Sequence, residues 1–250
     1  MKASIYILFA GLIYSSCQEQ TVPLQSTQVT VLVDTTDTWN VLPDPQTITA
    51  LYRFAENEHQ AAYFRLATTT DMLLSGQTEH YLANSMVTEK ANRFDDPNFR
   101  RKAVISFTNH LKHSIATFNE KARKDTTTLP YSECFRSIAR ELTAMVKNRM
   151  DTNVLVIYSD LGENSDLLNV YAPDGSQLLQ TDQAAIEKRY EETRLLPANL
   201  AGFTVLFIFQ PPDREADAVF NLQVKMYERM LSRRGAMVEV YSDNPKIYTR

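Results

Sequence analysis

Aspartate and hydroxyl side chains stand just after two of the most apolar stretches of the sequence. Asp34 follows the β-branched run 28–33 and begins the pattern Asp34-x-Thr36-x-Thr38. Asp160 follows a second apolar run, 153–159. Both runs predict strands, and in an open parallel sheet the carboxyl ends of the strands form the edge where ligands bind. We therefore expect these oxygen ligands to lie close together.

A third group of hydroxyls falls between these two strands. Ser132 opens a predicted helix, and Ser137 and Ile138 follow it five and six residues later; Thr128 in the preceding loop is the alternative candidate. Mg²⁺ prefers about six oxygen ligands and keeps several of its waters. With few anionic ligands, such an ion could accept a carboxylate from another protein, which is binding chemistry and requires no catalysis.

A plainer interpretation of the same residues is structural. Asp, Ser and Thr are common after strands because they cap helices and form turns. Motifs of common catalytic and nucleotide-binding classes are missing, since no Gly-x-x-x-x-Gly-Lys, Gly-x-Gly-x-x-Gly or Gly-x-Ser-x-Gly occurs. The Asp-x-Asp pattern of haloacid-dehalogenase-like phosphatases fails at Thr36, and the four histidines form no zinc pattern.

Hydrophobic periodicity predicts the elements that must position these residues. Strands are predicted over 28–33, 61–70, 79–88, 153–159, 203–209 and 237–241. Helices are predicted over 47–57, 99–124, 132–148, 182–193 and 211–233. Buried strands that alternate with amphipathic helices predict the α/β class, as a three-layer, mostly parallel open sheet flanked by helices.

The N-terminus has the features of an export signal. Lys2 precedes an apolar run over 5–14, and two serines come before Cys17. The stretch 13–17 resembles a bacterial lipoprotein box, which implies cleavage before Cys17 and a membrane-anchoring lipid on its thiol; release after Ser16 is the alternative. We therefore expect a signal peptide over 1–16, a tether over 17–27, a single domain over 28–250, and a location in the bacterial cell envelope.

Composition and the cysteine count are consistent with an ordinary exported domain. The chain has 44% hydrophobic and 22% charged residues and a net charge of −4, so nothing predicts a nucleic-acid partner. If Cys17 carries lipid, Cys134 has no cysteine partner within the chain. Cys134 falls in an apolar helical pattern, and we expect a small buried core residue and not a reactive thiol.

The element order and the three loops together resemble the von Willebrand factor A-like domain, which is also the fold of integrin inserted domains. The resemblance implies a metal-ion-dependent adhesion site for Mg²⁺ (or Mn²⁺), formed by Asp34, Thr36, Thr38, Ser132 (or Thr128) and Asp160. It also implies a domain that binds a protein partner through an acidic side chain of that partner, and together with the lipoprotein box this predicts a lipid-anchored binding domain. A metal-free structural or assembly lipoprotein of an envelope machine, for secretion or conjugation, is the alternative; a metal-dependent hydrolase is the least favoured hypothesis.

Overall fold

A computed structural model describes residues 25–36, 41–69, 77–84, 98–124 and 131–246. Three residues of the predicted sites, Cys17, Thr38 and Thr128, lie outside these ranges. The described strands form one six-stranded sheet in the order β3-β2-β1-β4-β5-β6. Their bounds are β1 Ser26–Asp34, β2 Ala61–Thr69, β3 Gln77–Leu82, β4 Thr152–Tyr158, β5 Phe203–Ile208 and β6 Met237–Tyr241.

The sheet is parallel except at one edge. β1 pairs in parallel with β2 and β4, and β4–β5 and β5–β6 are also parallel, whereas β3 returns antiparallel to β2. β1 and β4 are buried along nearly their whole length, as expected for strands covered on both faces. The predicted α/β class with a mostly parallel sheet is confirmed, and the strand order is that of Rossmann-like and von Willebrand factor A-like folds.

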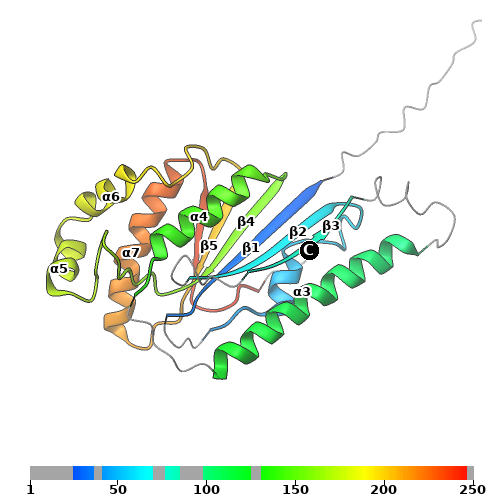
Figure 1. The fold of residues 1–250 in the computed structure, drawn as a ribbon, viewed down its shortest axis with the longest axis horizontal. Coiled ribbons are helices and arrows are strands. Elements are labelled where there is room, and N and C mark those ends of the chain that lie inside the picture. Colours follow the sequence, from blue (N-terminus) through cyan, green and yellow to red (C-terminus); the bar gives the residue numbers. More distant parts are fainter. Residues whose placement is uncertain (1–24, 37–40, 70–76, 85–97, 125–130, 247–250) are drawn as a thin grey trace, which may run out of the picture.

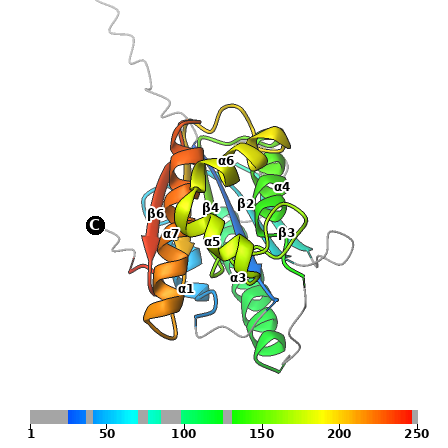
Figure 2. The same cartoon turned by 90° about the vertical axis from the view of Figure 1, so that its left-hand side faces the viewer.

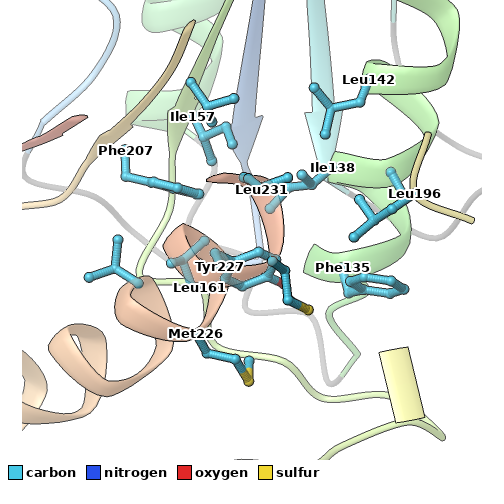
Figure 3. Close-up of a cluster of buried hydrophobic side chains, with 14 of the residues drawn as sticks. Phe135, Ile138, Leu142, Ile157, Leu161, Leu196, Phe207, Met226, Tyr227 and Leu231 are labelled. Carbon is cyan, nitrogen blue, oxygen red and sulfur yellow. The ribbon is translucent and has the colours of Figure 1, made fainter. Parts of the chain in front are cut away.

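Helices cover both faces of the sheet (Figures 1 and 2). One core contains side chains of α1 Pro45–Ala50 and α3 Phe99–Lys124. The core on the opposite face contains side chains of α4 Cys134–Lys147, α5 Pro173–Thr181, α6 Gln183–Glu192 and α7 Arg214–Ser232. In the second core, shown in Figure 3, α4 contributes Phe135, Ile138 and Leu142, and α7 contributes Met226, Tyr227 and Leu231. The core therefore holds α4 across the strands whose ends carry the predicted site.

The structure differs from the predicted elements at several boundaries. The helix predicted over 47–57 is the short α1, and the chain turns at Arg53, whose φ of 48° is left-handed and ends any helix. The strand predicted over 79–88 begins at Gln77 and ends at Leu82. β1 begins at Ser26, so Ser26 and Thr27 belong to the strand and not to the predicted tether.

One helix, α5, was not predicted. Pro173 stands in its first turn, where a missing N–H costs no hydrogen bond. Gly175 is required there, because a Cβ at this position would lie 1.9 Å from the carbonyl oxygen of Asn169. The helix has a single fully buried side chain, Leu179, so it lacks the repeated apolar spacing from which helices are predicted.

Candidate functional site

Asp34 and Ser159 leave the sheet side by side. Val33 of β1 pairs with Tyr158 of β4, and each strand ends at or within one residue of this pair. The chain runs from β1 toward one edge of the sheet and from β4 toward the other, so this is the topological switch point where ligands of open α/β sheets bind. We call residues 34–36, 131–135 and 159–164, which meet here, the carboxyl edge.

Asp34 is the centre of the carboxyl edge and is completely buried. Its Oδ1 accepts hydrogen bonds from the backbone N–H of Thr36 (3.0 Å) and from the hydroxyl of Thr36 (2.7 Å). Its Oδ2 accepts from the hydroxyl of Ser159 (2.8 Å) and from the thiol of Cys134 (3.3 Å). Each carboxylate oxygen thus has two donors, which come from three separate segments of the chain.

Cys134 is buried, as expected, but it lies in the site itself and not merely in the apolar core. Its Sγ is 3.2 Å from the Ser132 hydroxyl and 3.3 Å from Asp34 Oδ2, so the thiol stands between these two residues. The Ser159 hydroxyl is 3.7 Å from the same sulfur. Ser132, predicted as a direct partner of the metal with Asp34, therefore reaches the cluster through a sulfur atom.

The loops of the carboxyl edge are joined to each other by backbone hydrogen bonds. Ser132 and Asn164 exchange a pair of bonds of 3.2 and 2.9 Å, which places the segment before α4 against the segment after β4. The Glu163 carboxylate also accepts from the N–H of Phe135 in the first turn of α4 (2.8 Å). The site residues are thus held by a network in which each loop positions the others.

Asp160 lies next to this network and is partly exposed. Its Oδ1 accepts from the N–H of Gly162 (2.7 Å), and its Oδ2 lies 3.4 Å from the Tyr171 hydroxyl. A Cβ on Gly162 would come within 2.1 Å of that hydroxyl, so glycine is needed for Tyr171 to reach Asp160. Leu161, between Asp160 and Gly162, has a left-handed φ of 64° although its side chain is fully buried. The backbone is therefore strained next to Asp160.

Burial sets the protonation states of the two central groups. It raises the pKa of Asp34 above its usual value, and the hydrogen bonds from Thr36, Ser159 and Cys134 oppose this rise. Burial also raises the pKa of the Cys134 thiol well above its usual value, and the nearby carboxylate of Asp34 adds to the effect. Cys134 is therefore a neutral hydrogen-bond donor at pH 7 and not an activated nucleophile.

The fit of Mg²⁺ to this site can be judged from the side-chain atoms that would bind the ion. The structure brings Asp34, Thr36, Ser132 and Asp160 to the same edge of the sheet. However, both oxygens of Asp34 already accept protein hydrogen bonds, and a neutral thiol, which is a poor ligand for a hard ion, separates Asp34 from Ser132. Within the described ranges no three His, Cys, Asp or Glu side chains are grouped to hold a metal ion. The oxygen ligands as arranged do not fit Mg²⁺, and the adhesion-type metal site stays a prediction.

The carboxyl edge also contains two residues that the sequence did not single out. Ser159 bonds Asp34 with its hydroxyl, which in turn accepts from the N–H of Leu161 (2.8 Å). Glu163 is buried at the start of α4. Ser159 could have been found as the first polar residue after an apolar strand, the same signal that selected Asp34. Nothing in the pattern around Glu163 predicts its burial.

Comparisons with known proteins identify no family for the chain. No protein-family model matches it, and no curated protein matches it significantly. Among solved structures, it is similar to an aerotolerance-related membrane protein from Bacteroides fragilis, with 12% sequence identity and a TM-score of 0.37 over 87% of this chain and 92% of that chain. Similarity at this level identifies no function. Over the ranges that the structure describes, no helix combines the length and the apolar character needed to cross a membrane.

Proposed function

We propose that the chain is a protein-binding domain, anchored to a bacterial membrane by a lipid on Cys17, whose carboxyl edge binds a protein partner without a bound cation. In this role it is a structural or assembly subunit of an envelope machine and not an enzyme. The neutral, buried state of the Cys134 thiol supports the second point, because it removes the most obvious nucleophile of the site.

The observation that carries the proposal is the hydrogen bonding of the two aspartates. Each of the four carboxylate oxygens of Asp34 and Asp160 faces a donor from the protein itself. A cation would have to displace several of these donors. The hydrogen-bond donors of the protein stabilise the negative charge of these carboxylates, a role that a bound cation would otherwise have. The two aspartates therefore serve to fix the loops of the carboxyl edge.

Two exposed tyrosines give this edge the character of a binding surface. Tyr131 is 43% exposed and stands next to Ser132, and Tyr171 is 65% exposed although its hydroxyl reaches Asp160. Tyrosine is enriched in protein interfaces because it supplies a large apolar area and a polar tip at low conformational cost. Both rings are held by loops that the network of the carboxyl edge fixes, so a partner would meet a preformed surface.

Site-specific photocrosslinking in membrane extracts tests this proposal. We expect a crosslinker at Tyr131 or Tyr171 to capture the same protein, equally well in EDTA and in millimolar Mg²⁺. A crosslinker at Ile105, an exposed position of α3 on the opposite face of the sheet, is the matched control and should not capture it. Capture that requires Mg²⁺ and is abolished by Asp34→Ala would favour the metal-bridged mechanism instead. Equal capture at all three positions would contradict a binding site at the carboxyl edge.

A further inference from the structure

Glu163 is the one carboxylate of the carboxyl edge that is fully buried and only half satisfied. Its Oε2 accepts the N–H of Phe135 at 2.8 Å, whereas its Oε1 is shielded from solvent and has no hydrogen bond of good geometry, although the Ser165 hydroxyl is close enough to lower the pKa of the group. A buried oxygen without a donor costs roughly 1–3 kcal/mol, and more when the group is charged. The side chain is therefore tolerated far better as a neutral acid than as a carboxylate.

The position of Glu163 lets this side chain control the junction between two loops. Its side chain binds the first turn of α4, its carbonyl oxygen accepts the N–H of Val170 at 3.0 Å, and its neighbour Asn164 pairs with Ser132. Two of these bonds, those of Phe135 and Ser132, join the segment after β4 to the chain at the start of α4, whereas the bond to Val170 folds the segment on itself. Displacement of this side chain toward water would break its bond to Phe135, directly beside the backbone pair of Ser132 and Asn164.

The charged groups around Glu163 would do little to stabilise a negative charge on its buried carboxylate. The titratable and charged groups that face it or its immediate neighbours are Glu133, Cys134 and Arg136 near the start of α4, Tyr190 on α6, Tyr227 on α7, and Asp160 and Asp166 on its own segment. Arg136 is the only cation in this set of described residues, and it pairs with Glu133 (2.6 Å) and Asp166 (2.5 Å). Glu163 therefore has no dedicated positive partner.

We propose that Glu163 is a proton-controlled latch: its protonated form holds the segment 159–170 on the start of α4, and loss of the proton opens this junction. Burial raises the pKa of Glu163 to about 7, against the opposing effects of the nearby Ser165 hydroxyl and the Phe135 N–H. The latch thus operates within the physiological range of pH. That it regulates partner binding rests on the proposed function, but the latch itself can be tested on the chain alone.

Amide hydrogen exchange of the purified chain tests the latch. Between pH 5.5 and 7.5, after correction for intrinsic exchange, we expect exchange at Ser132, Asn164 and Val170 to rise on the order of tenfold, since one pKa unit corresponds to a tenfold change in an equilibrium. Glu163→Gln keeps an acceptor for Phe135 and should abolish this rise. Asp174→Asn, which removes an exposed carboxylate in the first turn of α5, is the matched control and should keep it.

Either of two results would overturn the latch. One is exchange at these amides that does not depend on pH in the wild-type chain, and the other is the same rise in Glu163→Gln as in the wild type. Should the variant fold poorly, carboxyl ¹³C spectra of the wild-type chain give a second measurement. A single carboxyl that titrates near pH 7 together with the rise in exchange supports the latch, and its absence contradicts it. Neither readout involves a partner, so failure of the proposed binding function would leave this test intact.

Discussion

The thiol of Cys134 donates a hydrogen bond to Oδ2 of Asp34 across 3.3 Å, and so links the start of α4 to the end of β1. The Ser159 hydroxyl donates to the same oxygen from the end of β4. A single buried carboxylate therefore joins three elements that are far apart in sequence. This arrangement predicts a structural role for Asp34 that a metal ligand in an open site would not have.

Replacing Asp34 should therefore destabilise the chain even without metal. We expect Asp34→Ala to lower the free energy of unfolding by about 2–4 kcal/mol, because four donors lose their acceptor in a buried site. Ser159→Ala removes one of those donors and should cost about 1 kcal/mol. Urea denaturation in EDTA measures both. A stable Asp34→Ala variant would show that the network contributes little.

Divalent cations should leave the stability of the wild-type chain unchanged. Thermal unfolding in EDTA and in millimolar Mg²⁺ or Mn²⁺ should give the same midpoint, because the aspartates already have protein donors. A cation at a hundredfold excess over its Kd would instead add about 2.7 kcal/mol, which raises the Tm of a chain of this size by roughly 5–10 °C. Such a rise, absent from Asp34→Ala, would establish the adhesion-type metal site after all.

Glu163 should make the stability of the chain depend on pH near neutrality. The pKa of Glu163 in the folded chain is about 7, above the unfolded value of 4.5, so the folded state holds the proton more tightly. The contribution of this group is fully present below about pH 4.5 and is lost as the pH rises to 7. At pH 8, Glu163→Gln should thus be more stable than the wild type by about 2–3 kcal/mol, with little difference at pH 5. Urea titrations at the two pH values measure this, and equal gains at both would contradict it.

Gly162 and Tyr171 should be coupled. An added Cβ at Gly162 would lie 2.1 Å from the Tyr171 hydroxyl, so Gly162→Ala should destabilise the chain by about 1–2 kcal/mol as an overpacked contact. In the Tyr171→Ala background most of this cost should disappear. A double-mutant cycle from denaturation measures the coupling, and additive effects would mean that the two residues do not restrict each other.

A buried ion pair between α4 and β2 offers a further test, away from the site. Glu141 is completely buried and accepts from Arg65 Nε (2.6 Å) and Nη2 (3.3 Å) on β2, while Arg65 also pairs with the half-exposed Glu79. Glu141→Gln should cost about 3 kcal/mol, because it removes the buried carboxylate that pairs with both Arg65 and Arg140. Glu79→Gln should cost under about 1 kcal/mol, as for an exposed pair. Similar costs for the two variants would contradict the prediction that the buried pair contributes more to stability than the exposed one.

Much of the fold could be predicted because its elements have strong local patterns. β1 is rich in β-branched residues and β4 is almost entirely apolar after Asn153. α3 was predicted with its observed bounds from an apolar stripe that includes Phe107, Leu111 and Ile115. The errors occur where local pattern is weak or is overridden. α5 has one fully buried side chain, and the helix predicted over 47–57 cannot run through Arg53, which adopts a left-handed conformation.

The candidate site was predictable only in part. The grouping of Asp34 with Thr36, and the presence of Ser132 and Asp160 nearby, follow from their places at the ends of parallel strands. The position of Cys134 does not, because a small apolar residue near the start of a helix gives no sign that it will face a carboxylate. The burial of Glu163 depends on how the segment after β4 packs against α4, and this tertiary contact leaves no mark on the spacing of residues.

The central place of β1 in the sheet has a consequence for the kinetics of folding. A chain is synthesised from its N-terminus, so β1 emerges first, yet one of its two neighbours is β4, and the contact between Ser26 and Asp151 spans 125 residues. β2 follows soon after β1, with Ser26 paired to Ala61, so the half-sheet β1–β2–β3 can assemble early. The carboxyl edge forms only when β4 inserts beside β1, and closing so long a loop makes this a late and slow step.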